Sequence, residues 1–169
     1  MAINLAEAVK LKSIIMKKIQ ELSHSARQLT HAIIEKGEQP KKPEYSLDML
    51  EEELKILRKD SRKLDALIYR ANIDHNVTFK NDDMPIVEAI ELANQLRAEA
   101  AFCKQLGSEE KEAYFHNQGD TMLYRVALFE PIEYRNRAKE LEKEAHRLSN
   151  LINAKNYQIQ IDFDDRNYF

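Results

Sequence analysis

Apolar residues recur at alternating steps of three and four along two long stretches of the chain. In the first stretch they are Leu5, Ala8, Ile15, Ile19, Leu22, Ala26, Leu29 and Ile33, and only Lys12 interrupts the series. This spacing is the seam of a coiled coil. Asn4 and Glu7 have the spacing of a capping box, and Gly37 is suited to a helix end. The pattern predicts one helix from Leu5 to Ile33.

The second stretch repeats the same rhythm after a plausible cap at Ser46. Its positions are Leu47, Leu50, Leu54, Leu57, Ser61, Leu64, Ile68 and Ala71. The connection from Lys36 to Tyr45 contains Pro40 and Pro43, which prevent helix continuation. Because short connections join antiparallel neighbours, residues 1–72 should form a long helical hairpin. Ser61 interrupts the series of leucines. It either sets the register between the two helices or, in the interpretation that we prefer, faces a small gap between them.

Shorter elements follow the hairpin. Val77–Phe79 reads as a short strand, and Asp83 with Pro85 opens a third helix. Its inward positions are Ile86, Ala89, Ala93, Leu96, Ala100 and Cys103, and the alanines among them indicate close approach of a neighbouring helix. Gly107 should end this helix, and residues 108–111 should begin a short helical turn.

The last third of the chain contains one ambiguous segment. Met122–Phe129 is compatible with strand or helix, and the extended form is preferred because Pro131 marks a new helix start. That fourth helix has inward residues Ala138, Leu141, Ala145, Leu148 and Ile152. Gln158–Phe163 alternates polar and apolar, as a half-buried strand does. We expect it to pair with Val77–Phe79 or Met122–Phe129 in one small sheet at one end of the bundle.

The predicted fold is mainly α: a long antiparallel coiled-coil bundle of about four helices with a minor β element at one end. We expect one domain over residues 1–169. Composition supports long helices, since 33% of residues are charged and the chain has only 3 Gly and 4 Pro. The net charge of -3 gives no attraction for phosphate backbones, so no nucleic acid is expected as a partner.

The cellular location of the protein is predicted from its cysteine content, its first residues and its longest apolar run. The single cysteine, Cys103, excludes an internal disulfide framework, and the first residues lack the features of a secretory signal. No uncharged apolar run approaches 20 residues, so we expect no membrane span. These signals predict a cytoplasmic protein.

No residue set requires a metal, a cofactor or a catalytic reaction. His24 and His31 are seven residues apart, which is too far for one zinc ion on a helix. Glu142 and His146 could offer two ligands but lack a matching pair, and an ordinary surface pair is the simpler interpretation. Cys103 occupies a seam position and is expected to be buried and inert. We therefore predict no catalytic, cofactor or metal site.

Five residues remain as weak candidates for interaction: His75, His116, Tyr124, Arg125 and Tyr157. The two histidines lie in expected loops, where functional residues concentrate. Tyr124 and Arg125 join Tyr134, Arg135 and Arg137 in a cluster that could bind an anion or a partner, although packing around the sheet is the preferred interpretation. The leading hypothesis is a non-enzymatic scaffold or protein-interaction module that forms a homodimer or higher oligomer. An enzyme with a loop site at His75 or His116 is an alternative.

Several segments resemble a known group of proteins. They are Leu5-Ala6-Glu7-Ala8, Gly37-Glu38 before Pro40, Leu67–Asn72 before Val77-Thr78, Pro131-Ile132 and Asn156-Tyr157. Together they resemble a small bacterial family of uncharacterised helical proteins, some of which are named septicolysin. Where those proteins often have Asn-Trp, this chain has Asn156-Tyr157, which keeps an aromatic residue. The resemblance implies no catalytic residues. The family name alone suggests a membrane-active, cytolysin-like protein, although no strongly amphipathic basic helix accompanies it.

Overall fold

A computed structural model describes residues 2–39 and 45–168, which form a mainly helical fold. The helices are α1 (Leu5–Gln28), α2 (Leu47–Asp74), α3 (Ile86–Ser108) and α4 (Pro131–Asn156). The strands are β1 (Ala2–Asn4), β2 (Asn76–Phe79), β3 (Asp82–Pro85), β4 (Glu112–Gln118), β5 (Thr121–Val126) and β6 (Gln160–Asp162). The chain divides into two compact units, Met1–Asp74 with Lys155–Phe169 and His75–Ala154. The prediction of a single domain stays a prediction.

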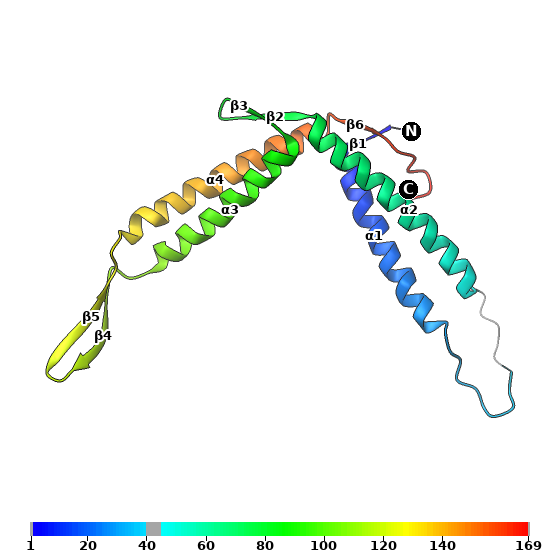
Figure 1. The fold of residues 1–169 in the computed structure, drawn as a ribbon, viewed down its shortest axis with the longest axis horizontal. Coiled ribbons are helices and arrows are strands. Elements are labelled where there is room, and N and C mark those ends of the chain that lie inside the picture. Colours follow the sequence, from blue (N-terminus) through cyan, green and yellow to red (C-terminus); the bar gives the residue numbers. More distant parts are fainter. Residues whose placement is uncertain (1, 40–44, 169) are drawn as a thin grey trace. The chain divides into compact units, whose positions relative to one another are not determined.

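The first unit is built on an antiparallel pair of helices, α1 and α2 (Figure 1). Lys12 pairs with Asp65, whereas Lys18, further along α1, pairs with the earlier residue Glu53 of α2. The predicted inward positions of α2 from Leu50 to Ala71 are all buried. Helices α1 and α2 therefore form an antiparallel pair within the stretch where the sequence predicts a helical hairpin. Pro40 and Pro43 of its connection lie outside the described residues.

The start of α1 agrees with prediction and its end does not. The Asn4 backbone N–H donates to Glu7 Oε2, and the Glu7 N–H donates to Asn4 Oδ1, both at 2.9 Å. The helix ends at Gln28, so its 24 residues span about 36 Å. The prediction that it reaches Ile33 is wrong, because α1 ends at Gln28 and Ile33 is fully exposed.

The two ends of the chain meet within the first unit. Strand β1 pairs antiparallel with β6, and the Leu5 N–H donates to the Ile159 carbonyl at 2.9 Å. Ile159, Ile161 and Phe163 are buried while the residues between them are exposed, as the alternating pattern predicts. This pairing closes the first unit around α1 and α2.

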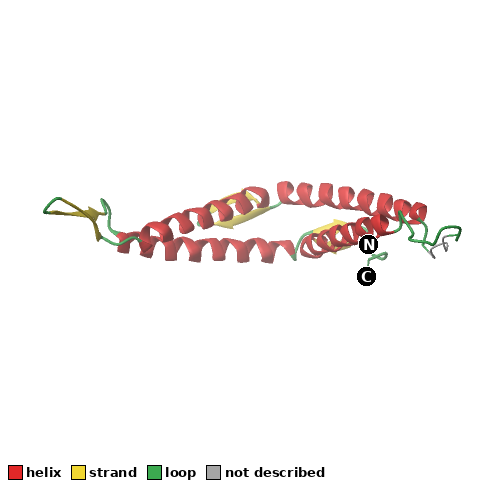
Figure 2. Ribbon diagram, turned by 90° about the horizontal axis from the view of Figure 1, so that it is seen from below, coloured by secondary structure: helices red, strands yellow, loops and turns green. Residues whose placement is uncertain are grey.

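The second unit contains the antiparallel pair α3 and α4, which lie side by side in both overall views (Figures 1 and 2). Arg97 Nη2 near the middle of α3 donates to Ser149 Oγ of α4 at 2.5 Å, and Arg137 at the start of α4 pairs with Glu99. All predicted inward positions of α3 are buried, including the free thiol of Cys103. Those of α4 are buried except Leu141, which is half-buried.

Gly107 has a different role from the predicted one. It lies inside α3, which continues to Ser108, and residues 109–111 form no helical turn. A Cβ atom at Gly107 would lie 2.9 Å from both Cα and N of Arg135. Glycine is therefore required for close approach of α4, because real Cβ atoms do not tolerate such a contact.

The strands form three separate pairs: β1 with β6, β2 with β3, and β4 with β5. Met122–Phe129 is extended over β5, in agreement with the preferred interpretation. The expected single sheet is wrong, because each of its three segments pairs with a strand that was not predicted. Local hairpins formed instead: Lys80 and Asn81 both have positive φ, as a two-residue type I′ turn requires, and Gly119 has a positive φ between β4 and β5.

Candidate functional site

The hairpin of β4 and β5 is the most unusual surface of the second unit. It extends beyond the ends of α3 and α4 in both overall views (Figures 1 and 2). Its strands pair antiparallel from Glu112 with Val126 to Gln118 with Thr121. Whereas other strands bury alternate side chains, no described residue of either strand is buried. The hairpin thus has no core of its own.

One face of this hairpin is apolar and exposed. Met122, Tyr124 and Val126 alternate along β5 and therefore point to the same side. Tyr114 is opposite Tyr124, so it shares that side, and the two rings meet edge to face at 6.0 Å. The exposed fractions are 58% for Tyr114, 63% for Met122, 51% for Tyr124 and 51% for Val126. We call these four residues the apolar face.

A β-bulge separates the apolar face from the histidine on β4. Phe115 is the extra residue, since Tyr114 pairs with Tyr124 and His116 pairs with Leu123. Because Leu123 alternates with Tyr124, His116 lies on the opposite side from the apolar face. The Phe115 ring is itself exposed and lies 4.4 Å from the His116 ring, measured between centroids.

The two chain segments at the base of the hairpin are joined to each other by polar contacts. Lys111 Nζ donates to the Phe129 carbonyl at 2.9 Å and pairs with Glu130 at 2.6 Å. Arg125 Nη2 pairs with Glu109 Oε2 at 3.1 Å. These contacts join the two chain segments that enter and leave the hairpin, so its base is held although its faces are open to solvent.

The predicted aromatic and basic cluster is used mainly for packing. Arg135 Nε and Nη2 donate to the Gly107 carbonyl at 3.2 and 2.8 Å. Arg137 pairs with Glu99, and the Tyr134 ring meets the Phe129 ring edge to face at 5.3 Å. Arg135 and Arg137 thus contact α3, and Tyr134 contacts Phe129, whereas the preferred interpretation placed these side chains around a sheet.

Three of the five candidate interaction residues lie on the hairpin: His116, Tyr124 and Arg125. His75 does not join them, because it precedes α3 and the hairpin follows α3, whose 23 residues span roughly 34 Å. His75 is half-buried, and its carbonyl accepts the Ile86 N–H at 2.9 Å. Tyr157 is exposed and belongs to the first unit.

Tyr114, Phe115, Met122 and Val126 are missing from the residues that the sequence singled out. Strand β4 contains Tyr114-Phe115 before Gly119-Asp120, and β5 follows directly. Two strand-prone runs around a short Gly-containing turn are a recognised hairpin signal. Applied to residues 112–126, that signal would have found both strands and the face they share.

Within the described residues, no three side chains of His, Cys, Asp or Glu gather as a metal site. Over the same residues, no helix combines the length and apolarity needed to cross a membrane. The geometry of the hairpin offers a contact surface.

Comparison with known proteins supports the fold alone. No model of a known protein family matches this chain, and no curated protein matches it. The fold is similar to a crystal structure of a functionally unknown conserved protein from Corynebacterium diphtheriae, with a TM-score of 0.74 and 19% sequence identity. The similarity covers 96% of this chain and 100% of that chain. A mainly helical protein with small antiparallel strand pairs is thus a fold that occurs elsewhere.

Proposed function

We propose that this protein is a non-enzymatic interaction module that associates with a second copy of itself through the apolar face of the β4–β5 hairpin. The observation that carries the proposal is the exposure of Tyr114, Met122, Tyr124 and Val126 on one side of the hairpin. Contiguous exposed apolar side chains of this kind mark interaction surfaces in soluble proteins. The helices act as the scaffold that presents them.

The small size of the hairpin supports the need for a partner. A two-stranded hairpin is at best marginally stable in water unless it packs on another element. Strands β4 and β5 have 7 and 6 residues and bury none of their described side chains. A partner that covers the apolar face would supply the missing packing.

The low net charge of the hairpin and the constant presence of other copies of the chain favour a second copy as the partner. From Glu112 to Val126 the hairpin carries two acidic residues, Glu112 and Asp120, and one basic residue, Arg125. A net charge of -1 on each hairpin repels a second copy only weakly and is too small to select a basic partner. A second copy is also present whenever the protein is present, so it can cover the face at all times.

The exposed area sets the expected strength of association. The four side chains expose roughly 450 Å² per copy, so a symmetric contact buries on the order of 900 Å² before Phe115 is counted. This value is below the standard size of specific interfaces and is typical of weak, transient contacts, so we expect a dissociation constant of about micromolar or weaker. We expect the two hairpins to stack face to face, with their sheets about 10 Å apart.

The finer description of the first unit is also part of this proposal. We propose that α1 and α2 pack as a coiled coil, supported by the three-four spacing of buried residues from Leu50 to Ala71.

We also propose that the chain belongs to the family whose members include proteins named septicolysin, supported by the segments that resemble that family. A cytoplasmic location is proposed from the single free thiol, Cys103.

Sedimentation velocity over a concentration series tests the proposed function. We expect the wild-type protein to shift from monomer to dimer, and the variant Tyr114→Ser/Tyr124→Ser to remain monomeric with unchanged helical circular dichroism. The matched control Tyr69→Ser/Tyr157→Ser removes two equally exposed tyrosines from the first unit and should dimerise like the wild type. A wild-type protein that stays monomeric at about 0.5 mM, well above a micromolar dissociation constant, contradicts the proposal. So does a double variant that dimerises normally.

A further inference from the structure

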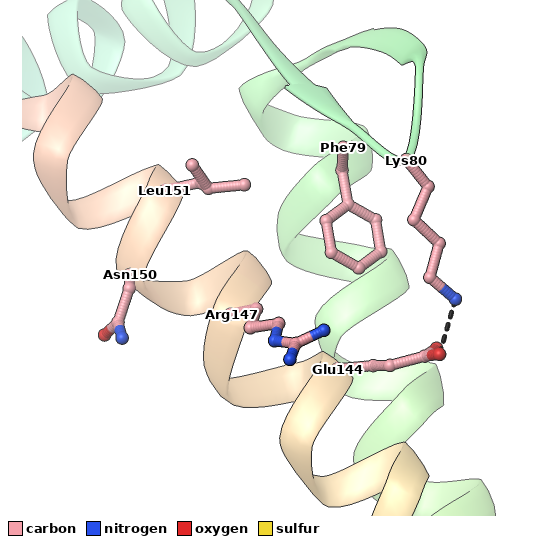
Figure 3. A pocket seen from close by; sticks show the side chains of 6 residues that line it. All are labelled: Phe79, Lys80, Glu144, Arg147, Asn150 and Leu151. Atoms are coloured by element: carbon pink, nitrogen blue, oxygen red, sulfur yellow. Dashed lines mark ion pairs between the residues drawn. The ribbon is translucent and has the colours of Figure 1, made fainter.

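A pocket of about 500 Å³ lies within the second unit, between the tip of the β2–β3 hairpin and one side of α4. It is lined by Phe79, Lys80, Glu144, Arg147, Asn150 and Leu151 (Figure 3). Its volume falls in the range of pockets that hold small molecules. It contains no residue of the β4–β5 hairpin, so it is independent of the proposed interaction face.

The pocket exists because the β2–β3 turn reaches α4. The turn residues Lys80 and Asn81 have φ of 53° and 68°, the left-handed values of a type I′ turn. The turn brings Lys80 Nζ to 2.5 Å from Glu144 Oε1 and to 5.6 Å from the centre of the Phe79 ring. The hairpin tip is thus tied to α4 by an ion pair at one side of the pocket.

The side of α4 that lines the pocket carries both charged and apolar side chains. Glu144, Arg147 and Leu151 are spaced by three and four residues, so they lie along one face of the helix. In Figure 3 the Leu151 side chain and the Arg147 guanidinium lie on the side of α4 nearest Phe79, whereas Asn150 points away. Phe79 and Leu151 both line the pocket; Leu151, 42% exposed, offers the larger apolar surface, and Phe79, 8% exposed, offers a smaller one.

Arg147 is the charge without a fixed partner. Lys80 and Glu144 neutralise each other through their ion pair. Among the described residues Arg147 has no hydrogen bond or ion pair, and its charge acts at longer range on the Glu140 carboxylate, which is paired with Lys143. A guanidinium presents two parallel N–H donors that match a carboxylate. The pocket therefore combines one available cation with two apolar side chains.

We propose that this pocket binds a small monocarboxylic acid with a flat apolar body. The carboxylate accepts hydrogen bonds from the Arg147 guanidinium, and the apolar body lies between the Phe79 ring and the Leu151 side chain. The Glu144 carboxylate disfavours ligands with several negative charges, because only one positive charge remains in excess. Cationic ligands are disfavoured by Arg147 and Lys80.

The test is a titration of isotope-labelled full-length protein with 3-phenylpropionate, followed by NMR amide shifts. We expect saturable shifts in residues of β2, β3 and the 144–151 segment of α4. The cation of similar shape, 3-phenylpropylamine, should give none. Arg147→Gln should weaken binding at least about tenfold, because the charge-assisted pair is lost. Lys139→Gln, an equal charge change elsewhere on α4, should leave binding unchanged.

Leu151→Glu provides a second variant at an exposed position. Its carboxylate should repel the ligand and abolish binding while the helical circular dichroism stays the same. Absence of saturable shifts at millimolar 3-phenylpropionate overturns the proposal, as does equal binding of the amine or full binding by Arg147→Gln.

Discussion

The Gly107 backbone in α3 lies directly against the Arg135 backbone in α4, and the Arg135 guanidinium donates two hydrogen bonds to the Gly107 carbonyl. This contact fixes the end of α3 to the start of α4 at the point where the chain leaves for the β4–β5 hairpin. A glycine permits it because there is no Cβ. The arginine then satisfies a carbonyl in the last turn of α3, where helical partners are missing.

Gly107→Ala should lower the free energy of unfolding by about 2 kcal/mol, since overpacking against backbone atoms outweighs the better helix propensity of alanine. Urea denaturation followed by circular dichroism measures the change. The control is Ala98→Gly, the reverse exchange at an exposed position of α3, which should cost about 1 kcal/mol from propensity alone. Stabilisation by Gly107→Ala would mean that α4 does not approach Gly107 this closely.

The phenol of Tyr168 joins the C-terminal segment to α2 by a hydrogen bond. Tyr168 Oη donates to Asp60 Oδ2 at 2.6 Å. We expect Tyr168→Phe to lower the free energy of unfolding by about 1 kcal/mol, the typical net value of one hydrogen bond. Urea denaturation at neutral pH measures it. An unchanged midpoint would show that the segment is not held by this bond.

The same phenol predicts a pH dependence. Burial, followed by the hydrogen bond to Asp60, raises the pKa of Tyr168 above its ordinary value of 10.0. The folded protein therefore holds this proton more tightly than the unfolded chain. Its contribution is fully present below pH 10 and is lost as the pH rises above that value. Wild-type stability should fall more steeply than that of Tyr168→Phe between pH 9.5 and about 11.5; parallel profiles would contradict this.

Lys12 occupies a predicted seam position of α1, but the structure buries the neighbouring Leu11 and leaves Lys12 half-exposed. Its Nζ lies 2.5 Å from Asp65 Oδ1 and 5.7 Å from the centre of the Tyr69 ring, and the hydrogen bond to Asp65 raises the pKa of Lys12. A double-mutant cycle with Lys12→Met and Asp65→Asn should give a coupling of about 0.5–1 kcal/mol. The exposed pair of Lys55 with Glu52 is the matched control and should show no measurable coupling. Equal coupling in both cycles would show that the seam position adds nothing.

Ser61 interrupts the leucines of α2 and is buried, with only a weak contact from its Oγ to Met16 Sδ at 3.7 Å. Sulfur is a poor acceptor, so Ser61→Ala removes little and leaves a small apolar group in the same space. We expect the free energy of unfolding to stay within about 0.5 kcal/mol of the wild type or to rise. A loss above about 1 kcal/mol would indicate that the hydroxyl sets the register of α1 and α2.

The helices could be predicted from the sequence because their buried positions repeat at a fixed period. Seams such as Leu50 to Ala71 and Ile86 to Cys103 are spread over several turns, so one misplaced residue does not obscure them. The pairing of strands was not predictable in the same way. Each strand has only 3 to 7 residues, and the alternation along Gln158–Phe163 shows which side is buried without naming the partner strand.

Prediction of the site was limited for a related reason. The signal for the β4–β5 hairpin is one short Gly-containing turn between two strand-prone runs and not a pattern repeated over many turns, so Tyr124 was singled out without Tyr114 and Met122. The end of α1 was predicted too late in the sequence, because Leu29 and Ile33 continue the three-four spacing of apolar residues beyond Gln28, where α1 ends. The close contact of Gly107 with Arg135 requires knowledge of both helices at once.

The most direct test of the central claim is an isotope-filtered NOE measurement on an equimolar mixture of methionine-methyl-labelled and unlabelled protein. If two copies meet through the apolar face, the Met122 methyl group will show NOEs to tyrosine ring protons of the other copy, and these will vanish in Tyr114→Ser/Tyr124→Ser. Intermolecular NOEs from Met49 or Met16 with none from Met122, or no intermolecular NOEs at millimolar protein, would contradict the account.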